Sequence, residues 1–193
     1  MRSKEKSMQR IVSSVTELLT QGELDKLTIG DITNHCHMTR QLFYHYFKDK
    51  YDVVAWIYKN DFQNLIDQIP DYITYQDLLL EVLHLLKSKQ LFYGHALQSK
   101  DYNALSTIMI THINLILSCY IRRSVTDVPQ DQLNFLIDFY SHGAVRCLTE
   151  LLTSLISFHE DQLSEWLIDT LPYSIRSQIL KCKIKSADLL VSF

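Results

Sequence analysis

The segment from residue 39 to residue 50, TRQLFYHYFKDK, holds the side chains best suited to binding or chemistry. Four aromatic residues lie within five positions, interleaved with His45 and bracketed by Arg40, Lys48 and Lys50. Arg and Gln side chains can reach the edges of DNA bases, and Tyr and His can donate hydrogen bonds to phosphates. A helix with this composition would suit the major groove of DNA, with the two lysines flanking the groove.

Helical spacing divides this segment into two faces. Phe43 and Phe47 are four positions apart, so we expect them to close a small core with Ile32 and the first helix. The residues on the other faces are Arg40, Gln41, Tyr44 and His45. They have no core to fill, which predicts an aromatic and cationic surface. For Tyr44 and His45, simple packing remains the alternative.

The elements around this segment predict a helix-turn-helix. An apolar stripe from Met8 to Leu19 indicates a first helix. Thr28 and Asp31 have the spacing of a capping box, which predicts a short helix over about 29–36. Thr39 is a suitable N-cap for a third helix through about residue 46. A longer amphipathic helix is expected over 50–69, before Pro70.

The rest of the chain is also expected to be helical. Only four glycines and three prolines interrupt it, and apolar residues recur at helical spacing, so we predict an all-α fold. Helical blocks are expected at about 74–98, 101–123 and 130–157, and another from about residue 159 to Leu171. The tail, 173–193, is expected to be helical at first and frayed at its end.

Composition indicates a globular protein with a weakly basic start. The net charge is −3, which argues against a chain coated by nucleic acid. Residues 1–50 hold eight Lys or Arg against six Asp or Glu, a balance of +2, whereas residues 51–193 hold eleven against sixteen, a balance of −5. This distribution permits local phosphate binding.

Several other classes of protein are disfavoured. The four cysteines are widely spaced and follow no signal-peptide pattern, so we expect reduced thiols in a cytoplasmic protein. The uncharged stretch 102–121 contains many polar residues, which favours a buried helix over a membrane span. No nucleophile–base signature or Gly-rich phosphate loop occurs, so we expect neither an enzyme nor a cofactor. His35, Cys36 and His37 are consecutive and cannot all face one ion, so no metal is expected.

The stretch LTIGDITNHCHMTRQLFYHYFKDKYDVV closely resembles the N-terminal module of the TetR family of bacterial regulators. The matching residues are Ile32, Cys36, Met38, Thr39, Phe43, Tyr44, Tyr46, Phe47, Lys50 and Val53. The resemblance covers about the first 60 residues. It implies a homodimer that binds double-stranded DNA at a near-palindromic operator, with a DNA-binding domain at 1–50 and a helical domain for dimerisation and effector sensing at 51–193. The predicted DNA-contacting residues are Thr28, Arg40, Gln41, Tyr44, His45, Tyr46, Lys48 and Lys50.

One position departs from the family pattern. His37 replaces the glycine of the turn, which adds strain if the turn needs a positive φ. This substitution supports an alternative: a helical interaction protein that has kept the fold without operator binding. The run RQ-x-FY-x-YFKDKYD-x-V-x-WIY is also similar to the subgroup that includes regulators of dihydroxyacetone kinase operons.

The body of the chain has surplus apolar surface. Residues 130–158 carry hydrophobic side chains over more than one stripe, which suggests one face for the core and one for a partner. With the block around Trp166, this segment resembles the helices that form the dimer interface of TetR proteins. Leu148, Leu152 and Trp166 are therefore the predicted interface residues. A single thick core is the alternative.

The resemblance also implies a ligand pocket inside the body. The candidate polar residues of such a pocket are Tyr93, His95, His112, Asn114 and Tyr140. Each of them could instead have a purely structural role. The effector could be a small molecule, or a protein that signals to the body without a pocket.

Overall fold

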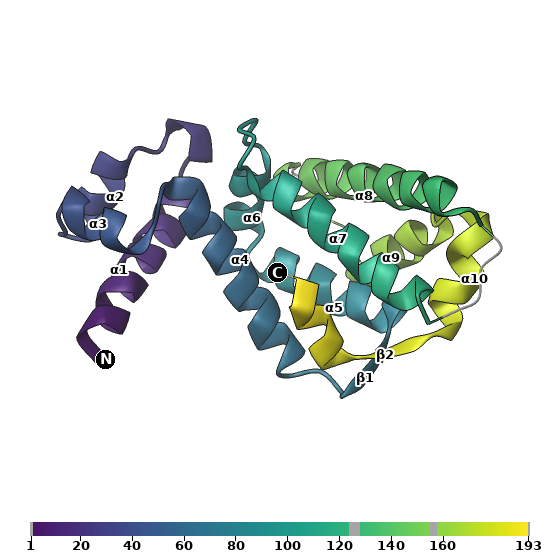
Figure 1. Cartoon of the computed structure of the whole chain (residues 1–193). Helices are drawn as coiled ribbons and strands as arrows, with labels where there is room; N and C mark the ends of the chain where they lie inside the picture. The colour runs from purple at the N-terminus through teal and green to yellow at the C-terminus, as the bar shows by residue number, and fades with distance from the viewer. Residues whose placement is uncertain (1, 124–127, 155–157, 193) are drawn as a thin grey trace.

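The computed structural model describes residues 2–123, 128–154 and 158–192, and its first fifty residues form a small helical head. The head comprises α1 (Arg2–Leu19), the 3₁₀ turn η1 (Leu24–Lys26), α2 (Ile29–His35) and α3 (Arg40–Tyr46). In Figure 1 the head lies at the left, and α4 (Lys50–Ile66) runs from it into the body. The predicted three-helix arrangement is confirmed.

The body is a cluster of helices with one short two-stranded sheet. Its helices are α5 (Tyr75–Ser88), α6 (Gln90–Leu97), α7 (Leu105–Ile121), α8 (Gln130–Thr153), α9 (Glu160–Asp169), α10 (Tyr173–Lys181) and the 3₁₀ segment η2 (Ser186–Ser192). Strand β1 (Tyr72–Thr74) pairs antiparallel with β2 (Lys183–Lys185). The all-α class is confirmed. Within the described ranges, no helix is both long and apolar enough to span a membrane.

Helices α2 and α3 of the head begin at side-chain caps that the sequence predicted. The Thr28 hydroxyl accepts from the backbone N–H of Asp31 at 3.1 Å, and the Asp31 carboxylate accepts from the backbone N–H of Thr28 at 2.9 Å. Thr39 caps α3 by accepting from the N–H of Leu42 at 3.2 Å. These bonds satisfy amides that have no partner inside the helix.

The core of the head forms where the spacing of the aromatic residues predicted it. Phe43 and Phe47 are almost fully buried, together with Ile32 of α2. From α1, Ile11 and Val15 are also fully buried in the same cluster. Burying a Phe side chain contributes about 1.5–3 kcal/mol. This small core fixes the angle at which α3 presents its opposite face.

Two of the predicted helical blocks are wrong in their extent. The block 74–98 is divided at Lys89, whose φ of −122° and ψ of 38° are not helical. The Lys89 ammonium binds both carboxylate oxygens of Asp61 in α4, at 2.6 and 2.7 Å. The block 101–123 begins as a helix only at Leu105, because Asp101 accepts from the N–H of Asn103 and forms a turn.

The predicted tail is helical at first, in α10, but from residue 183 to residue 190 it is not frayed, and residue 193 lies outside the described residues. After α10 the chain forms β2 against β1, with Ile184 opposite Ile73, and Ile184 is fully buried. Leu189 in η2 is buried as well. The hydroxyl of Tyr120 donates to the carbonyl oxygen of Ile73 at 3.1 Å, which ties α7 to the strand pair. The tail therefore completes the core of the body.

Candidate nucleic-acid interface and its control

The outer face of α3 carries the predicted DNA-contacting side chains. Arg40, Gln41, Tyr44 and His45 are all exposed. Tyr44 is 58% exposed, and its ring meets the buried ring of Phe43 edge-on at 5.5 Å. This contact holds Tyr44 on the helix while more than half of its side chain stays accessible.

Tyr46 differs from its neighbours. It is half-buried against the core of the head, and its ring meets the ring of His45 edge-on at 5.0 Å. Tyr46 therefore supports the exposed His45 more than it extends the outer face. Its helical position, two residues after Tyr44, turns it toward the core.

The turn before α3 keeps its shape without the usual glycine. His37 has φ 52°, the left-handed conformation that the sequence comparison anticipated as a source of strain. The N–H of Met38 donates to the carbonyl oxygen of Thr33 at 2.9 Å, and the Arg10 guanidinium donates to the carbonyl oxygen of Cys36. A residue with a β-carbon loses about 1–2 kcal/mol in this conformation. These bonds hold the turn in spite of that cost.

The start of α2 has its donors engaged within the chain. The hydroxyl and the N–H of Thr28 both donate to Asp31 Oδ2, at 2.6 and 2.9 Å. These bonds keep the pKa of the Asp31 carboxyl below its ordinary value, so it is ionised at neutral pH. Thr28 is thus a capping residue, and its hydroxyl proton is not available to DNA while the capping box holds.

Lys48 and Lys50 have different environments. Lys50 Nζ donates to the carbonyl oxygens of Leu24, Asp25 and Leu27, at 2.7, 3.0 and 2.9 Å. An ammonium group has three protons, so these bonds use all of its donors. The predicted phosphate contact of Lys50 would therefore require some of these bonds to break, whereas Lys48 is exposed just before α4.

The predicted effector residues are not gathered around one pocket. Tyr93 donates to Asp61 at 2.6 Å, and His95 Nδ1 donates to the carbonyl oxygen of Leu19 at 2.5 Å. Asn114 donates to Asp138 at 3.1 Å beside an open surface depression. His95 and Asn114 therefore lie away from the interior, and each has a structural partner.

A small apolar cavity lies in the interior of the described part of the body. It has a volume of about 50 Å³, and its lining includes Tyr58, Tyr75 and Tyr140. Tyr58 and His112 share a hydrogen bond of 2.7 Å. Burial, and secondarily the positive charge of Lys59, lowers the pKa of His112 to about 3, so the ring is neutral at neutral pH. Burial raises the pKa of Tyr140 to about 12.

A polar junction joins the head to the body, and its residues were missed in the sequence. Asp25 of η1 accepts from the hydroxyl of Ser99 at 2.5 Å, from the N–H of Lys100 at 3.4 Å and from the hydroxyl of Tyr51 at 3.4 Å. Chiefly through the Ser99 bond, the pKa of Asp25 is lowered. The partners of Asp25 lie 26 to 75 positions away and share no motif with it, so no local pattern could have paired them.

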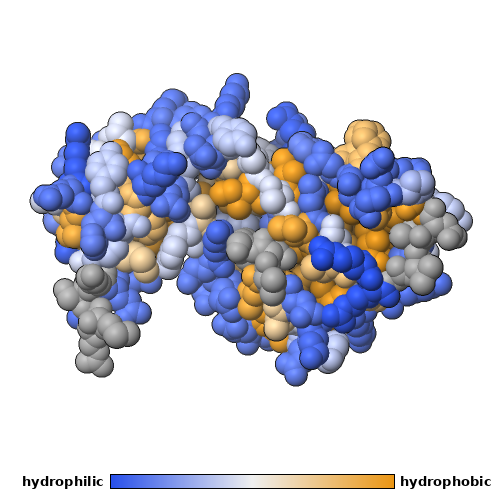
Figure 2. All heavy atoms as spheres, in the orientation of Figure 1, coloured by the Kyte–Doolittle hydropathy of each residue, from blue (hydrophilic) through white to orange (hydrophobic). Residues whose placement is uncertain are grey.

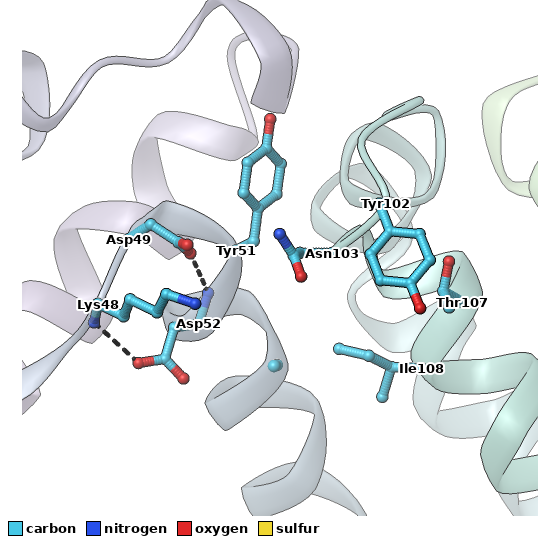
Figure 3. A pocket seen from close by; sticks show the side chains of 9 residues that line it. Lys48, Asp49, Tyr51, Asp52, Tyr102, Asn103, Thr107 and Ile108 are labelled. Carbon is cyan, nitrogen blue, oxygen red and sulfur yellow. Dashed lines mark hydrogen bonds between the residues drawn. The ribbon is translucent and has the colours of Figure 1, made fainter.

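A cleft of about 350 Å³ lies beside this junction. Figure 3 shows the first turns of α4, with Lys48, Tyr51 and Asp52, on one side, and Tyr102 and Asn103 from the α6–α7 connection on the other. The backbone N–H of Lys48 donates to Asp52 at 3.0 Å. The cleft separates the start of α4 from the body next to the Asp25 contacts.

The predicted dimer surface needs one correction. Leu148 and Leu152 are only 4% exposed and pack in the core of their own chain, so they offer little surface to a partner. Trp166 is 55% exposed, as a partner contact would require, and Phe139 of α8 is 71% exposed. A groove of about 600 Å³ runs between α8 and α9. Its lining includes Phe139, Gly143, Cys147, Leu151, Trp166 and Pro172.

Apolar residues are not spread evenly over the face drawn in Figure 2. On the face drawn in Figure 2, broad apolar patches lie over the body, while the head is mainly hydrophilic. Extended apolar surface on a soluble domain usually marks a contact with a partner or a ligand. This distribution is consistent with an apolar contact surface on the body and a polar contact surface on the head.

Known proteins resemble this chain in sequence and in structure. The family model for bacterial regulatory proteins of the tetR family matches residues 11–56. A curated relative is the HTH-type dhaKLM operon transcriptional activator DhaS of Lactococcus lactis subsp. lactis (strain IL1403). It is 32% identical over 83 residues, which is 43% of this chain and 44% of the relative. The match therefore spans less than half of that relative's length.

Two solved structures share the fold over most of the chain. The dihydroxyacetone kinase operon activator DhaS has a TM-score of 0.63 at 21% identity, covering 90% of this chain and 96% of that one. A TetR transcriptional regulator from Streptococcus agalactiae 2603V has a TM-score of 0.69 at 19% identity, covering 88% and 96%. At these identities the similarity establishes the fold of head and body together.

Proposed function

We propose that this chain is a member of the TetR family of bacterial regulatory proteins and a sequence-specific DNA-binding transcription regulator. The observation that carries the proposal is the outer face of α3. Gln41, Tyr44 and His45 are exposed there on a helix whose other face is fixed by a buried core. The helix-turn-helix is also the part matched by the family model. We assign DNA binding to residues 1–50, and dimerisation and sensing to 51–193.

The regulator is proposed to act as a homodimer on a near-palindromic site. A two-fold dimer presents two recognition helices, which can occupy successive major-groove faces about 34–36 Å apart. The exposed apolar groove between α8 and α9, with Phe139 and Trp166, supplies a surface that a second copy would cover. Such self-complementary contacts are the usual form of a two-fold interface.

Control of DNA binding is proposed to come from an effector that binds the body. Ligand sites usually have volumes of about 300–1,000 Å³. The interior cavity of about 50 Å³ is far smaller, so a small molecule that binds there would have to open the body, whereas a small molecule or a protein could bind an outer face without opening it. An effector should shift operator affinity by about 1–3 kcal/mol, and operator DNA should shift effector affinity by the same factor.

Two measurements test this function. Footprinting on DNA upstream of the chain's own gene should show two protected half-sites about 34–36 Å apart. A compound or protein that binds the chain should then be titrated with and without this DNA. A protected DNA region that is not divided into two half-sites would contradict DNA binding by a dimer. Identical titration curves would show that the body does not control the head.

A further inference from the structure

The first turn of α2 lacks a positive charge of its own. In helix-turn-helix proteins the helix before the recognition helix crosses the DNA backbone, so this turn lies near phosphates. The donors of Thr28 are engaged by Asp31, and the Asp31 carboxylate is exposed and ionised. An uncompensated carboxylate at this place would repel the DNA backbone.

Arg40 brings a positive charge to this turn from the next helix. A β-carbon added to Gly30 would lie 3.0 Å from Nη2 and 3.9 Å from Cζ of Arg40, and 3.4 Å from Thr28 Oγ1. The guanidinium is therefore folded over the start of α2. Arg40 is exposed, and none of the residues that the structure describes forms an ion pair with it. Its charge thus remains available to an outside anion.

We propose that Gly30 positions Arg40 to bind a DNA phosphate, and that Arg40 does not read a base. This inference rests on the proposed function and names the partner group of one residue in the same site. Any side chain at position 30 would compete with the guanidinium for the same space. A guanidinium can bind two phosphate oxygens at once, so a small change in its direction removes a paired contact.

Two groups of residues would then contact different parts of the DNA. Arg40, with the exposed Lys48, would bind the backbone and set the register of the head on DNA. Gln41, Tyr44 and His45, which stay on the outer face of α3, would contact the base edges. Loss of the first group should weaken binding to every sequence, and loss of the second should remove the preference for one sequence.

A double-mutant cycle tests the link between the two residues. The variants are Gly30→Ala, Arg40→Ala and the pair together, with Gly22→Ala as control, because nothing lies within 4 Å of a β-carbon at Gly22. The probes are a 30-base-pair duplex from upstream of the chain's own gene and a duplex of the same composition in scrambled order. Binding to both is measured by fluorescence anisotropy over a series of salt concentrations.

The expected results distinguish a role of Gly30 in positioning Arg40 from a purely structural role of Gly30. Arg40→Ala should weaken both duplexes by similar factors and reduce the salt dependence by about two counterions per dimer. Gly30→Ala should also weaken both, although its melting temperature should equal or exceed that of the wild type, because alanine favours the helix. In the Arg40→Ala background, Gly30→Ala should have no further effect. Gly22→Ala should bind as the wild type does.

Other outcomes would overturn the inference. If Arg40→Ala removes only the preference for the upstream duplex, Arg40 reads a base. If the two substitutions have additive effects on affinity, Gly30 does not act through Arg40. These results would leave the proposed function standing. Wild-type protein that binds neither duplex would overturn the proposed function and the inference together.

Discussion

At the scale of single residues, one buried histidine links stability to pH. The pKa of His112 is about 3 in the folded chain, against an ordinary value of 6.5. Between these two values the unfolded chain binds a proton that the folded chain excludes, so the free energy of unfolding falls as pH falls from about 6.5 toward 3. The full effect of one proton is about 1.4 kcal/mol per pH unit.

The variant His112→Gln tests this linkage, because Gln can still form a hydrogen bond with Tyr58 and does not titrate. Chemical denaturation from pH 7 to pH 4 should show a shallower loss of stability in the variant than in the wild type. Parallel curves would mean that His112 titrates alike in the folded and unfolded chains.

Substitutions of Lys48 and of Lys50 should affect different properties, DNA binding for Lys48 and the free energy of unfolding for Lys50. Lys50→Ala removes three charge-assisted bonds to backbone carbonyl oxygens, so we expect a loss of about 1–3 kcal/mol in the free energy of unfolding. Lys48→Ala should leave stability unchanged and flatten the salt dependence of DNA binding. Denaturation and anisotropy titrations of both variants check this. The assignment fails if the two substitutions exchange these effects.

At the scale of the elements, α8 has a core face and a partner face. Phe139→Glu should give a folded monomer, because it places like charges in an apolar interface without disturbing the core. Leu148→Ala should instead cost about 2–5 kcal/mol of stability, with the assembly intact while the chain stays folded. Light scattering and denaturation distinguish the two. A dimeric Phe139→Glu protein would place the interface elsewhere.

The elements near the N-terminus could be predicted because their signals are local. The capping box at Thr28, the cap at Thr39 and the four-residue spacing of Phe43 and Phe47 define α2 and α3 within a few positions. The break at Lys89 and the strand at Ile184 depend on partners far along the chain, Asp61 and Ile73. Neither has a glycine or proline to mark it.

For the candidate site, too, local signals in the sequence predicted only some of the residues correctly. Residue type and helical spacing identified the exposed set Gln41, Tyr44 and His45. They did not show that Lys50 is bound by backbone carbonyl oxygens, since these belong to residues 23 to 26 positions away. Leu148 and Leu152 were placed on the wrong face of α8 because both faces of that helix are apolar.

At the scale of the whole molecule, the contact of Asp25 with Ser99 fixes the head on the body. Ser99→Ala should speed amide hydrogen exchange in residues 19–28, because the head loses its shortest bond to the α6–α7 connection. Lys100→Ala is the matched control, since Lys100 contributes only its backbone N–H. Equal exchange in both variants would show that the contact does not restrain the head.

The same contact predicts the effect of acid. The pKa of Asp25 lies below its ordinary value of 3.8 in the folded chain, so the contact contributes fully above that value. Its contribution is lost as pH falls from about 3.8 through the lowered pKa. The head should therefore stay fixed to the body near neutral pH.

We propose that the outer face of α3 gives this chain its preference for one DNA sequence. The most direct measurement compares the upstream duplex with the scrambled duplex, for the wild type and for a variant with Gln41→Ala, Tyr44→Ala and His45→Ala. The wild type should prefer the upstream duplex by about 10³-fold or more. The variant, with an unchanged melting temperature, should bind both duplexes equally. A folded variant that keeps the full preference would contradict the claim.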